Sequence, residues 1–401
     1  MRILISGASI AGPVLAYWLT RRGYTVTVVE KAATLRKTGG HAVDLFRPSM
    51  RISEMMGVLP RIMERATGTD RLTVRTRGRT VTLDQGKLFQ AATDRHVEIM
   101  RDDLSEIYYD ATRNDVEYLF GDSIASIAPE GRVTFEHSAP REFDLIVGAD
   151  GLRSNVRRLV FGEVPEHFLG GYLAVASVPR DLAGPGVLDF HLEVGRAAGI
   201  YTADCLTDAR VIFLFRQDRI DYDHHDTTAQ KRLVTSTFTG LSPRVDQWLA
   251  ELPDTPAFYF DSITQLRLDH WSRDRVTLVG DAAYCPGPAV GGSTSLAIVG
   301  AYTLAGELAK AAGDLTTALP AYEQVMTDPV RASRAFATRA AKTLVPTSEL
   351  GIRTLIGAAR IVTALPTGLS RTIAKLGTRG LRVHDTLPVN DYPLPPIPTP
   401  S

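Results

Sequence analysis

One segment near the start of the sequence combines glycines and an acid in an order suited to binding a nucleotide. An apolar run from Met1 ends at Gly7, a turn continues to Gly12, a helical pattern follows, and an alternating run ends at Glu30. This order predicts a βαβ unit whose turn and helix N-terminus accept a pyrophosphate. Gly7 and Gly12 match the first and third glycines of the dinucleotide fingerprint, while Ser9 occupies the second position. An acid at Glu30 would accept both hydroxyl hydrogens of an unphosphorylated adenosine ribose.

A second segment repeats the pattern of a buried strand, a glycine turn and a helix. The apolar run from Phe143 leads into Asp150, and a helical pattern begins near Ser154. We expect Asp150 to lie close to a ribose or pyrophosphate, and Arg157 to offer paired donors to a phosphate or carboxylate. The alternative is structural: an acid that caps the helix and an arginine on the surface.

A third segment lies far along the chain, where an apolar strand from Arg275 ends at Asp281. A loop rich in proline and glycine, which includes Pro288, then leads to a helical pattern over about 293–311. The backbone amides of Gly291, Gly292 and Ser293 would be unpaired at that helix N-terminus and would favour negative charge. A reduced flavin carries such charge around its N1 and C2 carbonyl.

Together these motifs resemble the single-component FAD-dependent aromatic hydroxylases, the family of para-hydroxybenzoate hydroxylase and the tetracycline-inactivating monooxygenases. The resemblance runs from residue 1 to about residue 340 and also includes Arg101 and Leu104, the loop 39–45 and Trp271. It implies an FAD site. The expected FAD-binding residues are Gly7, Ser9, Ile10, Ala11, Gly12, Glu30, Lys31, Arg101, Asp150, Asp281, Pro288, Gly291, Gly292, Ser293 and Thr294.

The resemblance also implies a reaction. NADH or NADPH, a transient co-substrate, reduces FAD; the reduced flavin captures O2 as a C4a-hydroperoxide that oxygenates an aromatic or polyketide-like molecule. The sequence shows no second nucleotide fingerprint, and it assigns no catalytic acid or base. A halogenase or reductase on the same scaffold and a non-catalytic FAD-binding protein are the alternatives.

The sequence departs from the family pattern at Tyr284, where histidine is common, and at Ser293 and Ser295, which replace a frequent glycine and asparagine. We expect these changes to touch the flavin's pyrimidine edge and the loop before it. Cys285 lies near the expected flavin face, and we interpret it as a small packed thiol.

The predicted fold is α/β, with a Rossmann-like FAD-binding domain, an inserted antiparallel-sheet substrate domain and C-terminal helices. The FAD-binding domain takes 1–70, 93–165 and 273–342, and the substrate domain takes 71–92 and 166–272. C-terminal helices take 343–385, and a proline-rich, extended tail takes 386–401. On the inserted sheet, the candidates for lining a substrate pocket are His191, Tyr201, Phe213, Phe215 and Arg216.

Composition narrows the class of protein further. The 401 residues have a formal charge of +0 and contain two cysteines, and no run of apolar residues is long enough to span a membrane. We therefore expect a cytoplasmic monomer or homodimer without a nucleic-acid or membrane partner. The stretch 221–226 combines imidazoles and carboxylates, but we interpret it as a solvated loop and expect no metal site.

Overall fold

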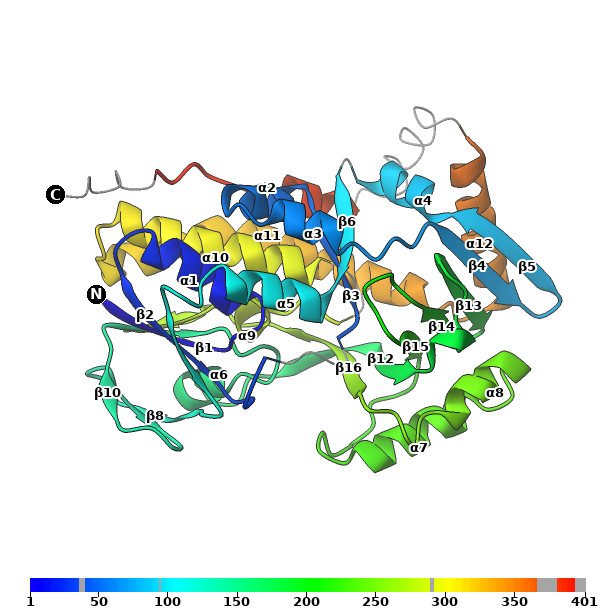
Figure 1. The fold of residues 1–401 in the computed structure, drawn as a ribbon, viewed down its shortest axis with the longest axis horizontal. Coiled ribbons are helices and arrows are strands. Elements are labelled where there is room, and N and C mark those ends of the chain that lie inside the picture. Colours follow the sequence, from blue (N-terminus) through cyan, green and yellow to red (C-terminus); the bar gives the residue numbers. More distant parts are fainter. Residues whose placement is uncertain (36–39, 94, 289–291, 366–380, 394–401) are drawn as a thin grey trace.

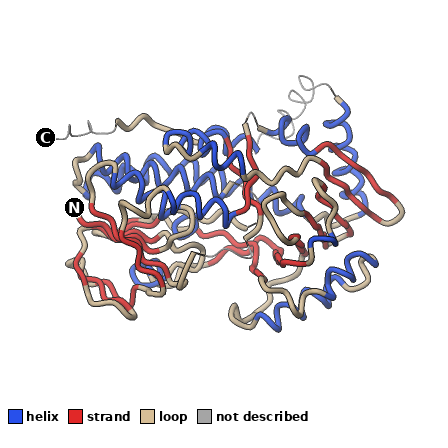
Figure 2. The backbone as a smooth tube through the Cα atoms, viewed as in Figure 1, coloured by secondary structure: helices blue, strands red, loops and turns tan. Residues whose placement is uncertain are grey.

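The computed structural model describes residues 1–35, 40–93, 95–288, 292–365 and 381–393. Two large sheets lie side by side in it, and long helices run above the first sheet and on toward the second (Figure 1). The strands of each sheet come from distant parts of the chain, and Figure 2 shows the strands in red beside the helices in blue. The predicted α/β class with a Rossmann-like half and an inserted antiparallel sheet is confirmed.

The first sheet is parallel apart from one edge strand. Its order is β17 (Ser272–Arg273), β18 (Val276–Leu278), β11 (Leu145–Gly148), β1 (Arg2–Ser6), β2 (Thr25–Glu30) and β7 (Glu117–Phe120). Strand β1 is central, and Ile3, Leu4 and Ile5 are fully buried because helices cover parallel sheets on both faces. The helices α1 (Ala11–Thr20) and α10 (Ser293–Lys310) pack against each other above it.

The second sheet is antiparallel except between β13 and β4. Its order is β16 (Phe258–Leu266), β12 (Glu166–Val178), β15 (Ala209–Phe215), β14 (Arg196–Tyr201), β13 (Val187–Glu193), β4 (Arg71–Thr76) and β5 (Arg79–Asp84). One face packs under α7 (Thr227–Phe238) and α8 (Pro243–Ala250). The opposite face packs against the end of α11 (Leu315–Leu344) and against α12 (Glu349–Ala364).

A ribbon of β3 (Ala42–Phe46) and β6 (His96–Met100) lies between the two sheets. The remaining elements are α2 (Arg47–Met55), α3 (Leu59–Glu64), α4 (Gln85–Ala92), α5 (Arg101–Asp110), β8 (Ile124–Ile127), β9 (Arg132–Phe135), β10 (Arg141–Glu142), α6 (Asn155–Phe161), η1 (Arg180–Leu182), α9 (Asp281–Tyr284) and η2 (Leu381–Thr386).

The sequence did not predict every element. The helices α7 and α8 interrupt a region expected to consist of strands, and α4 occupies the end of the segment 71–92. The C-terminal helices expected over 343–385 give α12, which ends at Ala364, and the short η2, and residues 366–380 lie outside the described residues. The boundaries of the domains themselves stay a prediction.

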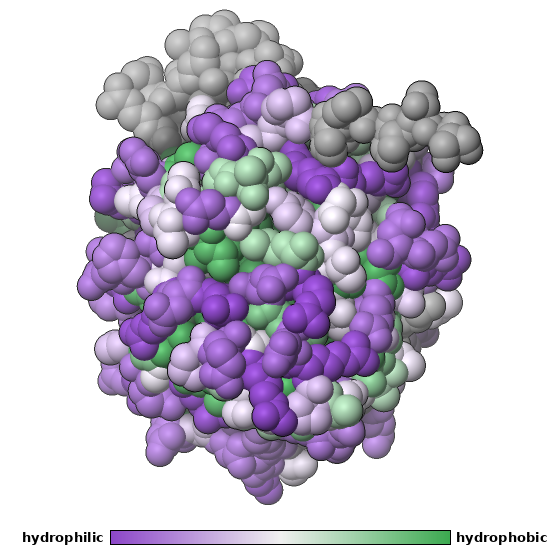
Figure 3. Space-filling model, turned by 90° about the vertical axis from the view of Figure 1, so that its left-hand side faces the viewer, coloured by the Kyte–Doolittle hydropathy of each residue, from purple (hydrophilic) through white to green (hydrophobic). Residues whose placement is uncertain are grey.

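The side of the molecule that carries the N-terminus is mostly hydrophilic, with hydrophobic side chains in small groups between polar ones (Figure 3). Among the described helices, none combines the length and the apolar character needed to cross a membrane.

The core under α7 gives a test of this architecture. Phe213 is 0% exposed and packs against Phe238, with 4.9 Å between ring centroids. Phe213→Ala should lower the free energy of unfolding by about 3–5 kcal/mol, because it leaves a cavity that the sheet cannot close. Chemical denaturation measures the change. The control Leu350→Ala, at a side chain that is 70% exposed, should shift stability by less than about 0.5 kcal/mol. Equal shifts in the two variants would contradict the packing described.

Candidate FAD-binding site

The first glycine turn is so tightly packed that side chains cannot enter it. A Cβ atom on Gly7 would lie 2.5 Å from the carbonyl oxygen of Ala149, and one on Gly12 would lie 1.9 Å from that of Gly7. Gly7 also has a φ of 110°, which few other residues adopt. The turn after β1 therefore lies directly against the turn after β11, and both glycines are explained by close backbone contact.

Glu30 lies where the sequence placed it, at the end of β2 beside the glycine turn. Its carboxylate accepts hydrogen bonds from the amides of Ala8 and Ala32, both at 2.9 Å. Arg101, the first residue of α5, donates to the hydroxyl of Ser9 at 3.1 Å. The carboxylate of Glu30 and the guanidinium of Arg101 thus both contact the turn. The carboxylate could accept hydrogen bonds from a ribose, and the guanidinium could donate to a phosphate. Lys31 next to them is exposed, whereas Ile10 and Ala11 are buried at the start of α1.

Asp150 and Arg157 have structural partners. The carboxylate of Asp150 accepts hydrogen bonds from the amides of Asn155 and Val156 at 2.9 and 3.1 Å, at the start of α6. Ser154 caps the same helix by accepting from the amide of Arg157. The guanidinium of Arg157 donates to the carbonyls of Ala282 and Leu152 at 2.9 and 2.6 Å. Asp150 thus contacts the start of α6, as the structural alternative has it, but Arg157 is buried and does not lie on the surface. Arg157 ties α6 to the turn after β18.

Asp281 begins α9, on the same edge of the first sheet as the glycine turn. Burial raises the pKa of Asp281, while the nearby guanidinium of Arg101 and the thiol of Cys285 lower it. Cys285 is 1% exposed, and burial raises its pKa well above the ordinary value, so the thiol stays protonated. The interpretation of Cys285 as a packed thiol agrees with this environment.

The N-terminus of α10 carries no side-chain cap. Gly292 is its N-cap residue, in the left-handed region with a φ of 85°, and Ser293 and Thr294 occupy the first turn. Their amides precede the first intrahelical partners and are available to an electronegative group. Pro288 lies in the preceding loop, whereas Gly291 lies outside the described residues.

Three features of the described residues fit a bound FAD. The glycine turn has no Cβ atoms at Gly7 and Gly12, Glu30 lies beside it, and the N-terminus of α10 carries no side-chain cap that would compete with the flavin ring. Residues from the first and third segments adjoin directly: a Cβ on Gly280 would lie 3.4 Å from that of Ala11.

Two of the departures from the family pattern point away from this site. Tyr284 is 0% exposed, and its hydroxyl hydrogen bonds with that of Tyr322 at 3.1 Å, behind α9. It fills space that Gly300 leaves open, since a Cβ there would lie 1.9 Å from the Tyr284 hydroxyl. Ser295 accepts from the amide of Phe46 at 3.1 Å and so joins α10 to β3. The expectation that Tyr284 touches the flavin edge is therefore corrected.

The predicted substrate residues divide between the two faces of the second sheet. His191, Phe213 and Phe215 lie on the face under α7 and α8, where His191 accepts or donates a hydrogen bond with Ser242 and both phenylalanines belong to the core. Their prediction as pocket residues is corrected, because side chains alternate along a strand and these point away from β3. Arg216 donates to the carbonyl of Ala341 in α11.

Tyr201 alone of these five predicted residues meets the loop beside the expected flavin. Its hydroxyl accepts from the amide of Ala42 at 2.8 Å. On the same face Arg210 is 3% exposed and donates to the carbonyl of Gly40 at 3.2 Å. His41 lies 6.1 Å from the ring of Tyr259, and burial, with the charge of Arg101, lowers the pKa of His41 to about 4. Sequence reasoning missed these neighbours of Tyr201.

A second missed group lies on the β3–β6 ribbon. Asp44 and Glu98 face each other in register, His96 contacts Asp44 at 2.6 Å, and Glu98 accepts from the hydroxyl of Thr67 at 2.5 Å. Burial, then the charge of Asp44, raises the pKa of Glu98 to about 7. The alternation of polar and apolar residues along His-Val-Glu-Ile-Met is the sequence signal that could have located this group.

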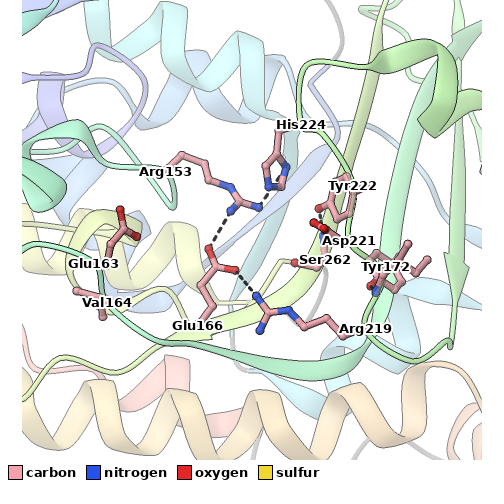
Figure 4. Close-up of a pocket in the computed structure, with 11 residues that line it drawn as sticks. Arg153, Glu163, Val164, Glu166, Tyr172, Arg219, Asp221, Tyr222, His224 and Ser262 are labelled. Atoms are coloured by element: carbon pink, nitrogen blue, oxygen red, sulfur yellow. Dashed lines mark hydrogen bonds and ion pairs between the residues drawn. The ribbon is translucent and has the colours of Figure 1, made fainter.

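A cavity of about 590 Å³ opens beside the Asp150 turn (Figure 4). Arg153 crosses it, donating to Glu166 and to Asp261, each at 2.8 Å, and to Nδ1 of His224 at 3.3 Å. Arg219 also pairs with Glu166. Because these acids already engage both arginines, the cavity offers little free positive charge to a phosphate.

The stretch 221–226 supplies part of this cavity wall. Tyr222 donates to Asp261 at 3.1 Å, and Asp226 caps α7 by accepting from the amide of Ala229. Within the described ranges, no cluster of three or more histidine, cysteine, aspartate or glutamate side chains is arranged to hold a metal ion.

Comparison with known proteins agrees with this geometry. Residues 1–324 match the protein family described as "FAD binding domain". A flavin-dependent monooxygenase of Legionella longbeachae is 36% identical over 343 residues, which cover 84% of this chain and 87% of the relative. The chain belongs to the flavin-dependent monooxygenase family.

A second sequence relative and a solved structure are also similar to this chain. An uncharacterized protein of Mycobacterium tuberculosis strain H37Rv is 43% identical over 334 residues, covering 78% of this chain and 86% of that protein. The crystal structure of tetracycline destructase Tet(55) superposes with a TM-score of 0.83 at 29% identity, covering 98% of both chains.

The close packing of the glycine turn predicts that adding one methyl group at Gly12 weakens FAD binding. Gly12→Ala would push the first turn away from Gly7 and should reduce FAD binding by at least about tenfold, the scale of one lost charged hydrogen bond. Flavin absorbance of the purified protein and a fluorescence titration with FAD measure it. The control is Gly357→Ala in α12, where a Cβ meets nothing within 4 Å. Retention of FAD by the Gly12 variant would refute the close packing.

The raised pKa of Glu98 predicts a pH dependence of stability without FAD. Between about pH 4.5 and pH 7 the folded protein holds a proton on Glu98 that the unfolded chain releases. The free energy of unfolding therefore loses a contribution as pH rises through this window. Compared with Glu98→Gln, the wild type should lose stability progressively from pH 4.5 to pH 7, as measured by urea denaturation at each pH. Parallel curves for the two proteins would show that Glu98 titrates normally.

Proposed function

We propose that the protein is an FAD-dependent monooxygenase that uses NADH or NADPH and O2 to hydroxylate or otherwise oxygenate an aromatic or polyketide-like small molecule. One observation carries the proposal: three distant segments bring the Gly7–Gly12 turn, Asp281 and the uncapped N-terminus of α10 to one edge of the first sheet. The family membership supports it.

Each part of this site would serve a different part of FAD. Glu30 would bind the adenosine ribose, and the Gly7–Gly12 turn with Arg101 would hold the pyrophosphate. The amides of Ser293 and Thr294 would stabilise negative charge at N1 and the C2 carbonyl. FAD, once bound, would supply electron transfer from NADH or NADPH and activation of O2 at its C4a position.

The substrate would lie between the second sheet and the 40–42 loop. Tyr201, Tyr259 and His41 give this region aromatic surfaces, and Arg210 beside them is buried and paired with Asp208. Such an aromatic wall favours a flat molecule. The likeness to the tetracycline destructases supports a substrate with several fused rings. We also propose a cytoplasmic monomer or homodimer.

Rapid mixing and isotope labelling test this function. Mixed anaerobically with NADH or NADPH, the FAD-loaded protein should lose its oxidised flavin absorbance, and a tetracycline should then gain one oxygen atom from isotopically labelled O2. Asp281→Ala should weaken FAD binding by about tenfold through the loss of a charged partner, whereas Asp328→Ala, an exposed acid on α11, should not. Flavin that neither nucleotide bleaches would contradict the proposal. Bleaching without oxygen transfer to any of a panel of phenols and polyketides would leave a reductase or oxidase instead.

A further inference from the structure

The C-terminal strap, defined as residues 383–393, runs over α2 and α10 (Figure 1). Its contacts are specific. Arg47 donates to the carbonyl of Asp385, Tyr302 donates to that of Asn390, and Tyr392 donates to Glu307 at 2.7 Å. The strap therefore lies along α10 instead of extending into solvent.

The ring of His384 occupies the space above Gly292. A Cβ atom on Gly292 would lie only 1.9 Å from Nε2 of His384 and 2.1 Å from its Cε1. Gly292 is the N-cap residue of α10. The imidazole therefore packs directly against the residue that precedes Ser293 and Thr294, whose amides are free at the helix N-terminus. The strap and the candidate flavin site are thus in direct contact through one glycine.

His384 is itself held on several sides. It is 0% exposed, its Nε2 hydrogen bonds with the hydroxyl of Ser333 at 3.1 Å, and its ring stacks on Phe46 at 5.4 Å. Phe336 packs edge-on against it. Phe46 in turn donates its amide to Ser295 in the first turn of α10. The imidazole therefore fixes β3, α10 and α11 around the same helix N-terminus.

The imidazole of His384 is neutral, and one of its two ring nitrogens, Nδ1, has no hydrogen-bond partner among the described residues. Burial lowers the pKa of His384 to about 4, so it adds no charge near the flavin at neutral pH. The Nδ1 atom is also buried. A buried polar atom without a partner is unusual in a native protein and needs an explanation. A hydrophobic residue would fill the same space without this cost, so simple packing does not account for histidine here.

The other end of the strap offers a matched comparison. The ring of Tyr392 covers Gly306 in the same way, since a Cβ there would lie 2.2 Å from Cδ2 of Tyr392. Gly306 lies fourteen residues beyond Gly292, or about 20 Å along the helix. One aromatic side chain of the strap therefore contacts the flavin end of α10, and the other contacts its remote end.

We propose that His384 is a positioning residue for FAD, which holds Gly292 and the first amides of α10 where they meet the N1 and C2-carbonyl edge of the flavin. The proposal rests on the FAD site of the proposed function. His384 acts through Gly292 and does not react with the substrate. Its removal lets the N-terminus of α10 relax away, and negative charge on the ring then loses stabilisation.

Sulfite is the probe, because it adds to N5 of oxidised flavin and leaves negative charge at the N1 and C2-carbonyl edge. In the FAD-loaded full-length protein, His384→Ala should weaken sulfite binding by about tenfold, the scale of a partly buried charge at a helix terminus, and should lower the flavin reduction potential. Ser333→Ala, which removes the hydrogen bond to the ring, should shift both in the same direction by less. Tyr392→Ala should reduce thermal stability but leave sulfite affinity and potential unchanged.

Unchanged sulfite affinity in His384→Ala would overturn the proposal, and so would an equal loss in Tyr392→Ala, which would reduce the strap to general stabilisation. If His384→Ala does not fold, sulfite affinity is compared in His384→Gln, Ser333→Ala and Tyr392→Ala. Unchanged affinity in the first two variants, or an equal loss in Tyr392→Ala, would then overturn the proposal. None of these measurements needs NADH, NADPH, O2 or a substrate. A flavin that no nicotinamide reduces would therefore defeat the proposed function and leave this inference standing, and the reverse also holds.

Discussion

Everything in this structure depends on three backbone turns that approach each other without side chains between them. The turn after β1 touches the turn after β11 at Gly7 and Ala149, and the turn after β18 reaches α1 at Gly280 and Ala11. Parallel strands bring these turns to one edge of the sheet, because their carboxyl ends coincide there. At Gly7 only glycine permits the contact, so the arrangement of this edge depends on the absence of a Cβ atom there.

This constraint explains why much of the chain is devoted to one site. Asp150 and Arg157 hold the turns together through α6, whatever ligand lies beside them. The long α10 then carries the site toward the second sheet, and the C-terminal strap closes over both of its ends.

The sequence predicted the parallel half well, since buried strands followed by glycine turns have a strong and local pattern. The second sheet was harder: alternation located β13, β14 and β15 but could not show that Phe213 faces α7 while Tyr201 faces the 40–42 loop. The side chain of Tyr284 occupies space left by the missing Cβ of Gly300, sixteen residues away. The ring of His384 likewise occupies space left by the missing Cβ of Gly292. Such partnerships arise only when the chain is folded.

The central claim is that the three turns and the N-terminus of α10 together hold one FAD molecule. A crystal structure of the protein with FAD tests it most directly. The account predicts that Glu30 lies within hydrogen-bonding distance of the ribose hydroxyls and that the amides of Ser293 and Thr294 face N1 and the C2 carbonyl. A flavin ring bound instead in the cavity beside Arg153, or an adenosine remote from Glu30, would contradict it.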